Sequence, residues 1–409
     1  MFRRLVLAAL ALALAAPSAP PFEVNGDGPV PVRAVPPHPS AAEVAALGKQ
    51  LFFDPALSAS HAQSCATCHD PAHAYGPSNA LPAQLGGRDS RAQGLRAVPS
   101  LRYLQRVPLF TEHYFDEDVD ESVDAGPTGG LTWDGRARNP HEQARLPLLS
   151  PLEMANADEA AVVAAVAKSS YAREFERVFG RDIFASTGAA FDAITRALEV
   201  YQDTPEEFFP YTSKFDAFLR HRTELTAQEK RGLALFEEPS KGNCARCHPS
   251  EIGSSGGFPA FTDFGYVAIA VPRNRRLAAN GDPKYYDLGL CGPLRTDLRG
   301  RAEFCGMFRT PSLRNVALRR TFFHNGAFHS LEDALHFYVD RDLHPAEWYP
   351  GGSYDDLPAE YRANVSREPP FDRKPGDAPA LSDAEIADLI AFLGTLTDGW
   401  KPPAGAASR

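Results

Sequence analysis

The sequence has little positive charge for its length. Lysine and arginine together number 42 against 52 aspartates and glutamates, which gives a formal net charge of −10 over 409 residues. Because nucleic-acid binding needs clustered cations against the phosphates, we expect no nucleic-acid partner. Long apolar runs are also missing, since no segment reaches the ~20 apolar residues of a transmembrane helix. Even so, 44% apolar and 23% charged residues exclude a disordered chain, and the length suggests two or three domains.

The longest apolar run is short and lies at the N-terminus. It covers residues 5–16 and directly follows Arg3 and Arg4. A basic start followed by so short an apolar stretch is typical of a secretory signal peptide. We therefore predict a signal peptide at residues 1–20, a proline-rich lead-in at residues 21–40, a periplasmic location and no membrane span after cleavage. The alternative is an uncleaved membrane anchor, which has similar flanks.

Cysteine is scarce, and its six positions divide unequally. Four of them form two Cys-x-x-Cys-His pentapeptides, Cys65-Ala66-Thr67-Cys68-His69 and Cys244-Ala245-Arg246-Cys247-His248. This pattern is typical of c-type haem attachment, in which two thiols bond the porphyrin and the adjacent histidine binds the iron. A zinc site would need four closely grouped ligands, but the two pairs are 179 residues apart. A redox dithiol would need a βαβ setting that the sequence lacks. The sequence therefore predicts two covalently bound haem c groups.

The two remaining cysteines, Cys291 and Cys305, flank a segment that contains Gly292, Pro293 and Gly300. Spare cysteines usually pair in an oxidising compartment, and a bridge here would constrain a flexible loop. We therefore predict a disulfide between them, with two free thiols as the alternative.

The two haem motifs are preceded by similar segments. Gly48-Lys-Gln-Leu-Phe-Phe-Asp-Pro55 precedes the first motif, and Gly232-Leu-Ala-Leu-Phe-Glu-Glu-Pro239 precedes the second, so the chain contains an internal repeat. Apolar residues at helical spacing also predict helices at residues 157–167 and 191–201 and after Ser382. Few stretches show the alternation of apolar and polar residues that is typical of strands. We predict a mainly α protein with long loops and two cytochrome c-like haem domains, at residues 41–205 and 206–409.

Several further segments carry distinctive motifs. They are Leu131-Thr-Trp-Asp-Gly-Arg136, Glu142-Gln-Ala144 with Pro151-Leu-Glu-Met154, Arg309-Thr-Pro-Ser-Leu-Arg-Asn315, and Phe323-His-Asn-Gly-Ala-Phe328 leading into Ser330-Leu-Glu-Asp-Ala-Leu-His-Phe-Tyr338. Together with both haem motifs, these segments resemble the bacterial di-haem cytochrome c peroxidases and their MauG-like relatives. The resemblance extends over residues 40–395.

The resemblance implies a role for each matching residue. Trp133 would lie between the two haems, and Gln143 and Glu153 would line the peroxide-binding face of the N-terminal haem. One carboxyl near the iron can move a proton between the two peroxide oxygens, and this is the chemical role that Glu153 would have. Tyr338 would be the sixth ligand of the C-terminal haem, with Met307 as the rival. On spacing alone Tyr338 is a core residue, since it shares a helical face with apolar side chains.

Three positions depart from the family pattern. Residues 74–94 contain no histidine, although many relatives close the N-terminal iron with a histidine from this loop, so we predict an open N-terminal haem. The family's calcium ion would use the backbone carbonyls of Arg319 and Thr321, but Ala97 stands where an asparagine ligand is expected. Gly242 replaces the surface tryptophan through which MauG oxidises its protein substrate.

These residues predict a periplasmic di-haem peroxidase that reduces hydrogen peroxide to water with electrons from a small cytochrome c or cupredoxin. The resemblance also implies a homodimer. Two alternatives remain open. A MauG-like oxidase would modify a partner protein through high-valent haem, which Tyr338 favours and Gly242 opposes. A non-catalytic electron carrier would hold both irons closed, with two low-spin haems.

Overall fold

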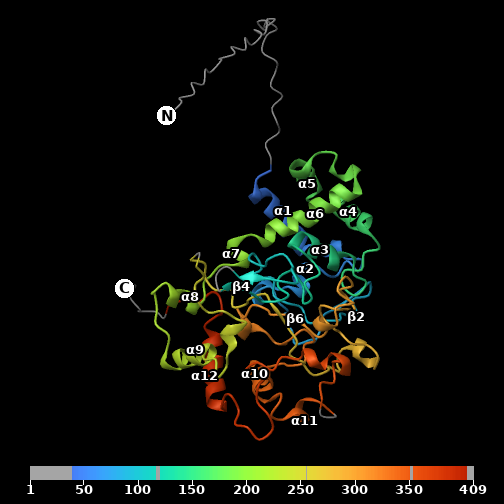
Figure 1. Cartoon of the computed structure of the whole chain (residues 1–409). Coiled ribbons are helices and arrows are strands. Elements are labelled where there is room, and N and C mark those ends of the chain that lie inside the picture. Colours follow the sequence, from blue (N-terminus) through green and yellow to red (C-terminus); the bar gives the residue numbers. More distant parts are fainter. Residues whose placement is uncertain (1–38, 117–119, 255, 351–352, 403–409) are drawn as a thin grey trace, which may run out of the picture. The chain divides into compact units, whose positions relative to one another are not determined.

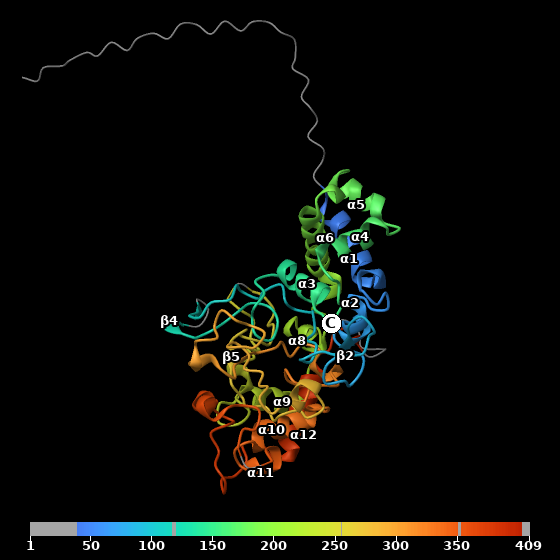
Figure 2. The same cartoon turned by 90° about the vertical axis from the view of Figure 1, so that its right-hand side faces the viewer.

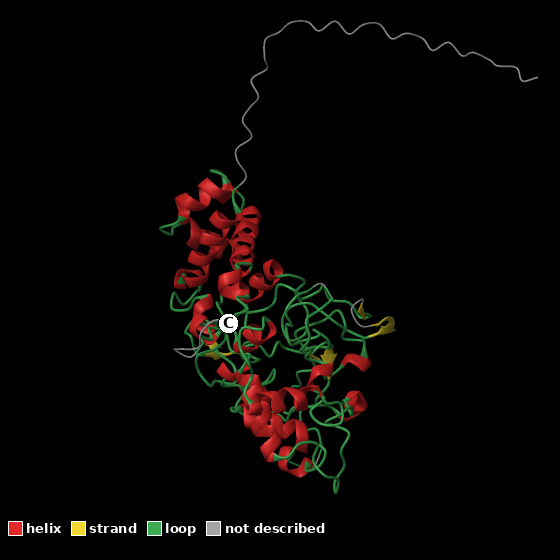
Figure 3. Cartoon of the chain, turned by 90° about the vertical axis from the view of Figure 1, so that its left-hand side faces the viewer, coloured by secondary structure: helices red, strands yellow, loops and turns green. Residues whose placement is uncertain are grey.

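The computed structural model describes residues 39–116, 120–254, 256–350 and 353–402. The predicted signal peptide and nearly all of the lead-in fall on residues 1–38, outside the described residues. The described chain is mainly helical, with long loops and short strands, as expected from the sequence (Figure 1 and Figure 3). Within the described residues, Pro39 begins one compact unit that continues to Pro402.

The helices are connected by loops of very different length. The α-helices are α1 (Ala41–Phe53), α2 (Cys65–Cys68), α3 (Pro140–Leu149), α4 (Glu159–Ala167), α5 (Ala172–Phe179), α6 (Thr187–Gln202), α7 (Pro205–Phe208), α8 (Lys214–Leu219), α9 (Ala227–Glu237), α10 (Leu331–Asp340), α11 (Pro345–Trp348) and α12 (Asp383–Gly394). Short 3-10 helices cover Pro55–Leu57, Pro71–His73, Ile183–Ala185, Cys244–Arg246, Ala278–Gly281, Ala302–Phe304, Val316–Leu318 and Ala359–Asn364. Within the described ranges, no helix has both the length and the apolar character that crossing a membrane requires.

The strands of the described chain form three separate antiparallel pairs. They pair β1 (Leu85–Gly86) with β2 (Ala92–Gln93), β3 (Phe115–Asp116) with β4 (Asp120–Asp124), and β5 (Tyr266–Val267) with β6 (Phe308–Arg309). In the last pair Tyr266 lies opposite Arg309, so this ladder joins the loop after the second haem motif to a distant segment.

The internal repeat forms the same helix crossing twice. Gly48 of α1 lies against α6, where an added Cβ would come within 1.9 Å of the Ala197 carbonyl oxygen. Gly232 of α9 lies against α12, where an added Cβ would come within 2.1 Å of the Asp388 carbonyl oxygen. Only glycine permits helices to approach so closely at these points. Both helix pairs lie side by side in Figure 1 and in the turned view of Figure 2.

An aromatic residue one turn after each glycine completes the crossing. Phe52 meets Tyr201 edge to face with ring centroids 5.5 Å apart, and Phe236 meets Phe392 in the same way at 5.1 Å. Such pairs contribute about 0.5–1.5 kcal/mol beyond the area they bury. The repeated sequence therefore builds two equivalent helix pairs, and the first helix of each pair, α1 or α9, precedes one haem motif.

The buried apolar residues form two large clusters. One lies between Val44 and Phe208 in the sequence and contains α1 and α6, and the other lies between Phe215 and Leu396 and contains α9 and α12. The predicted domain boundary, between residues 205 and 206, lies close to the change from one cluster to the other and stays a prediction. A small third cluster consists of Leu290, Leu298 and Phe304, and we call it the 290–304 cluster.

The helix boundaries follow the capping residues of the sequence. The helix predicted at residues 157–167 is α4, which begins at Glu159 because an aspartate caps it there. The helix predicted at 191–201 is the C-terminal part of the longer α6. The helix predicted after Ser382 is α12, and it opens with a reciprocal capping box between Ser382 and Glu385.

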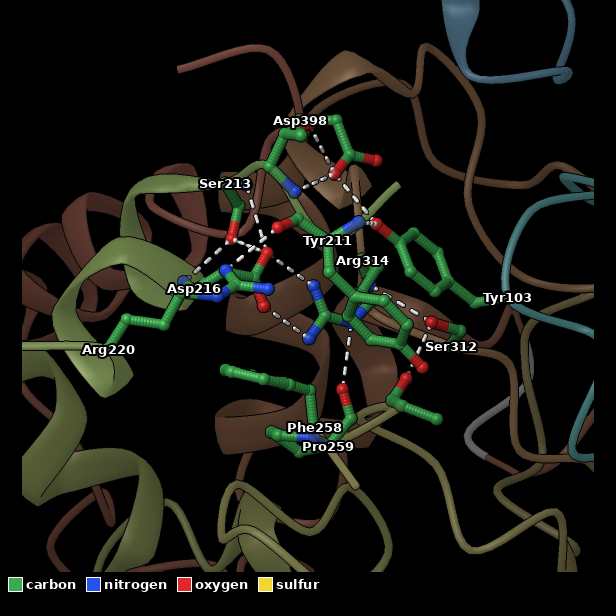
Figure 4. Close-up of polar contacts among 12 residues, drawn as sticks. Tyr103, Tyr211, Ser213, Asp216, Arg220, Phe258, Pro259, Ser312, Arg314 and Asp398 are labelled. Atoms are coloured by element: carbon green, nitrogen blue, oxygen red, sulfur yellow. Dashed lines mark hydrogen bonds and ion pairs between the residues drawn. The ribbon is translucent and has the colours of Figure 1, made fainter. Parts of the chain in front are cut away.

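A buried ion pair lies where the two halves of the chain meet (Figure 4). The guanidinium of Arg314 donates to both carboxylate oxygens of Asp216, at 2.9 and 3.0 Å, and neither side chain is exposed. The same guanidinium lies 4.6 Å from the ring centre of Tyr103, whose hydroxyl donates to Asp398 at 2.7 Å. Because Tyr103 belongs to the first half of the chain, this cluster ties that half to the C-terminal helices.

The predicted disulfide between Cys291 and Cys305 is present. It closes the loop before β6, and the Leu290 N–H, next to the first cysteine, donates to the Met307 carbonyl oxygen at 3.1 Å. The bridge therefore holds the segment that leads into β6 and the Arg309–Asn315 motif.

Candidate haem and peroxide sites

The first Cys-x-x-Cys-His motif forms the short helix α2, and His69 is the residue that ends it. Its Nδ1 donates to the Tyr75 carbonyl oxygen at 3.0 Å, because a carbonyl oxygen can only accept. Nε2 therefore keeps its lone pair. Burial lowers the pKa of His69 to about 4, so the ring is neutral at neutral pH, as metal ligation requires.

The second motif repeats this arrangement on the 3-10 helix that begins at Cys244. Nδ1 of His248 donates to the Phe261 carbonyl oxygen at 2.8 Å, and burial lowers the pKa of His248 to about 4. The same carbonyl accepts from the Leu313 N–H at 3.2 Å. The Arg309–Asn315 segment thus fixes the carbonyl that orients the second histidine.

Both motifs offer the donor set that haem c needs. None of the four motif cysteines forms a disulfide, and all of them are partly accessible. Nevertheless the surrounding protein desolvates them, which raises the pKa of Cys65 and of Cys244 to about 12. Thiols that are partly accessible but lie in apolar surroundings suit attachment of a flat apolar cofactor. The residues present therefore fit two haem groups, each with two thiols and one imidazole nitrogen.

Glu153 lies beside the first motif. Its backbone carbonyl accepts from the Gly87 N–H at 2.7 Å, which anchors the turn that carries it. The side chain is exposed to solvent, yet the protein around it desolvates the carboxyl and raises its pKa, against the positive charge of Arg136. Burial raises the pKa of Cys68 to about 11, and the charge of Glu153 adds to this rise. The carboxyl group is therefore within electrostatic reach of a haem-attachment thiol.

Gln143 lies on α3, the helix that leads into the turn of Glu153. Asn139 caps α3 by accepting from the backbone N–H of Glu142 at 2.8 Å, and the helix packs on α6. After α3 ends, the Glu153 N–H donates to the Ser150 carbonyl oxygen at 3.1 Å. Both predicted peroxide-site residues thus belong to one helix-and-turn segment.

Trp133 lies where the segments that follow the two motifs meet. Its indole Nε1 donates to the Ala97 carbonyl oxygen at 2.7 Å, and the residue is 9% exposed. Its backbone carbonyl accepts from the Arg309 N–H at 3.0 Å, while the Ala97 N–H donates to the His324 carbonyl oxygen at 2.7 Å. Ala97 follows the first motif in the sequence, whereas Arg309 and His324 follow the second. Trp133 and Ala97 therefore connect the two halves of the chain.

Tyr338 lies beside the second motif, on α10. Burial raises the pKa of its phenol, and the negative charges of the Cys247 and Cys244 thiolates would raise it further, so the ring is close to both. Met307, the rival ligand, packs against the 290–304 cluster. Of the two candidates, the structure brings Tyr338 to the second motif.

Comparison with known proteins identifies the family of this chain. The family described as "Di-haem cytochrome c peroxidase" matches residues 42–224. The methylamine utilization protein MauG of Paracoccus denitrificans is 35% identical over 373 residues, which cover 88% of this chain and 90% of that protein. This chain belongs to the di-haem cytochrome c peroxidase family. The resemblance stated from the sequence is thereby confirmed, and the chain is a member of a family of oxidoreductases that act on peroxide.

Members of both branches of the family are similar to this chain. The diheme peroxidase BthA from Burkholderia thailandensis has a TM-score of 0.80 and 41% sequence identity, covering 88% of this chain and 87% of that one. The cytochrome c551 peroxidase of Nitrosomonas europaea is 29% identical over 338 residues, covering 81% of this chain and 83% of that protein. Proteins named as peroxidases and proteins named MauG therefore both match over most of the chain.

The residues expected to hold the family's calcium ion have a different use here. The guanidinium of Arg319 donates through Nε to the Thr321 carbonyl oxygen at 3.2 Å and through Nη2 to the Val98 carbonyl oxygen at 3.0 Å. Ala97 offers no side-chain oxygen. A positive group thus already uses one of the expected carbonyls, and these residues do not fit a calcium ion.

A charged network that fixes the Trp133 segment was missed by sequence reasoning. Asp134 is fully buried and accepts from Arg96 at 2.7 Å and from Arg136 at 2.9 Å. These two cations hold the pKa of Asp134 below its usual value although burial opposes this. Arg96 also donates to both carboxylate oxygens of Asp287, at 2.6 and 2.7 Å. The motif Trp-Asp-Gly-Arg contains two members of this network, Asp134 and Arg136. The other two, Arg96 and Asp287, lie in no motif.

Proposed function

We propose that this protein is a periplasmic di-haem c-type peroxidase that reduces hydrogen peroxide to water with electrons from a small cytochrome c or cupredoxin. The observation that carries the proposal is the difference between two otherwise similar motifs. A desolvated carboxyl, Glu153, accompanies the first motif, whereas a phenol, Tyr338, accompanies the second. The first site is suited to proton transfer beside an open iron, and the second to a closed iron that passes electrons.

The two haem groups would be held by the two motifs in the same way. When bound, each haem supplies an iron that changes oxidation state. The protein residues that would hold the N-terminal haem are Cys65, Cys68 and His69, and those for the C-terminal haem are Cys244, Cys247, His248 and Tyr338. The cysteines would attach each group covalently, and the hydrogen bond at Nδ1 of each histidine leaves Nε2 free to bind the iron.

Glu153 supplies the proton transfer. Its carboxylate takes the proton from one peroxide oxygen and returns it to the other, which then leaves as water. Gln143 hydrogen-bonds the peroxide and orients it. With two electrons and two further protons, one hydrogen peroxide gives two water molecules. Trp133, which contacts both halves of the chain, is the route for electrons between the two sites.

The decisive experiment is an EPR spectrum of the oxidised holoprotein. We expect one high-spin signal from the open N-terminal iron and one low-spin signal from the closed C-terminal iron, without prior reduction. Two low-spin signals that persist after partial reduction, together with no response to peroxide, would reject the enzyme proposal. That result would leave a non-catalytic electron carrier.

A MauG-like oxidase is the second candidate. The 35% identity to the Paracoccus protein over 90% of its length favours it. Gly242 opposes it, since this glycine packs against the Leu235 carbonyl oxygen, where an added Cβ would lie 2.6 Å away. Steady-state oxidation of reduced cytochrome c by peroxide separates the two candidates. Rapid turnover supports the peroxidase, and negligible turnover supports the oxidase.

The remaining expectations depend on the sequence and on family membership. The periplasmic location follows from the apolar run at residues 5–16 after two arginines. The division into haem domains at residues 41–205 and 206–409 follows from the repeat, and a homodimer follows from the family. Size-exclusion chromatography of the mature protein tests the last of these.

A further inference from the structure

Residues 97–99 form a short strip that contacts both halves of the chain. The Ala97 N–H donates to the His324 carbonyl oxygen, and its carbonyl accepts from the indole of Trp133, both at 2.7 Å. The next carbonyl, that of Val98, accepts from Arg319 at 3.0 Å. The strip therefore sets the distance between the first haem motif and the segments that follow the second.

The guanidinium of Arg319 is a partly buried cation whose hydrogen-bond partners are backbone carbonyls. It donates to the carbonyl oxygens of Thr321 and Val98, and it forms no ion pair with a described carboxylate. Burial lowers the pKa of Arg319 to about 10, which still leaves the group charged at neutral pH. Its charge also lowers the pKa of His69, so it lies close to the first iron-binding histidine. Taking a charge partly out of water without a carboxylate partner costs free energy, and here the hydrogen bonds to the two carbonyl oxygens offset that cost.

The same place is where the family binds calcium. Ca²⁺ takes six to eight oxygen ligands, from carboxylates, amides, backbone carbonyls and water. Here Ala97 removes the amide oxygen and the guanidinium already uses the Thr321 carbonyl. A divalent ion beside a fixed guanidinium would also be repelled, and no carboxylate among the described residues pairs with Arg319 to offset the repulsion.

We propose that the guanidinium of Arg319 replaces the calcium ion as the cation that ties the 97–99 strip to the segment after the second motif. A cation attached to the chain cannot be lost to a chelator, so the holoprotein binds no structural calcium. The tie joins Val98 to Thr321 through one planar group with two N–H donors, a geometry that guanidinium provides and a lysine ammonium does not.

The first test uses the wild-type holoprotein. It is equilibrated with millimolar CaCl₂, desalted and analysed for metals, and its thermal unfolding is compared in CaCl₂ and in EGTA. We expect far less than one calcium per chain and the same unfolding temperature in both conditions. One tightly held calcium per chain, whose removal by EGTA lowers the unfolding temperature, would overturn the proposal. This measurement decides the matter even where variants fail to fold.

The second test uses the substitution Arg319→Met, with Arg320→Met as the control, because Arg320 is exposed. We expect Arg319→Met to unfold several degrees lower and to lower the midpoint potential of the N-terminal haem, since a nearby positive charge is lost. The control should change neither quantity. The double variant Ala97→Asn/Arg319→Met restores the missing oxygen and removes the cation, so its unfolding temperature should rise with CaCl₂. If Arg319→Met behaves like Arg320→Met in both measurements, the guanidinium has no such role.

Discussion

Replacing Glu153 by glutamine should abolish most peroxide turnover while leaving both haems in place. The Gly87 N–H donates to the Glu153 carbonyl oxygen at 2.7 Å, and a Cβ added at Gly86 would lie 2.2 Å from the carbonyl oxygen of Leu152. The backbone on both sides of this contact is therefore closely packed. The amide therefore occupies the position of the carboxyl and removes only the proton transfer. General acid–base groups contribute typically about 10²–10⁴-fold in rate, or about 3–5 kcal/mol of the barrier.

The same role predicts how turnover changes with pH. Desolvation by the surrounding protein raises the pKa of Glu153 above its usual value of 4.5. The carboxylate is needed as the base, so activity is present above the raised pKa and is lost as the pH falls through it. The wild-type profile of kcat/KM should therefore show an acidic limb with its midpoint above pH 4.5. The Glu153→Gln variant should show no such limb.

The assay is steady-state oxidation of reduced cytochrome c by hydrogen peroxide, with haem content measured by pyridine haemochrome absorption. Glu142→Gln is the matched control, because Glu142 lies on α3 in the same segment and is held by Arg138 at the surface. Turnover of Glu153→Gln within about threefold of wild type would refute the assigned role. So would an acidic limb that survives the substitution.

Four further substitutions test the ligand and the scaffold. Tyr338→Phe should alter only the low-spin EPR signal, and an unchanged spectrum would move the ligand assignment to another residue. Gly232→Ala must separate α9 from α12 by about 1 Å and should cost about 1–3 kcal/mol of unfolding free energy. Gly188→Ala has nothing within 4 Å and should instead stabilise by up to about 1 kcal/mol. Asp216→Asn leaves Arg314 buried without its charge partner and should cost about 3–5 kcal/mol in chemical denaturation. Equal stability of the two glycine variants, or an Asp216→Asn variant as stable as wild type, would contradict the packing account.

The parts of this fold that could be predicted from the sequence are those that local chemistry determines. Haem attachment needs five consecutive residues, so both motifs are visible without knowledge of the fold. Helix starts are visible because a cap and its partner are three residues apart, as in the box of Ser382 and Glu385. The repeated glycine was visible as a pattern, but its reason, contact with a backbone carbonyl of a distant helix, required the structure.

The parts that could not be predicted depend on partners far apart in the chain. Asp216 and Arg314 are 98 residues apart and Arg96 and Asp287 are 191 residues apart, so no spacing rule relates them. The contacts of Arg319 were hidden for another reason. Its partners are backbone carbonyls, which every residue type carries, so no sequence pattern marks them. The resemblance assigned the carbonyls of Arg319 and Thr321 to a metal, and only the structure shows that the side chain of Arg319 is the cation at Thr321.

The residues that make the two sites different lie outside the repeat. Within the repeat the halves are equivalent, since each has a glycine at the crossing, an aromatic pair one turn later and a histidine held by a backbone carbonyl. Glu153 enters on the turn after α3, and Tyr338 enters on α10, and the repeat predicts neither of these positions. A duplicated scaffold therefore accounts for two equivalent haem motifs, whereas the segments that carry Glu153 and Tyr338 would determine which of the two proposed irons meets peroxide. It follows that exchanging residues within the helix crossings should change stability, and exchanging residues 153 and 338 should change reactivity.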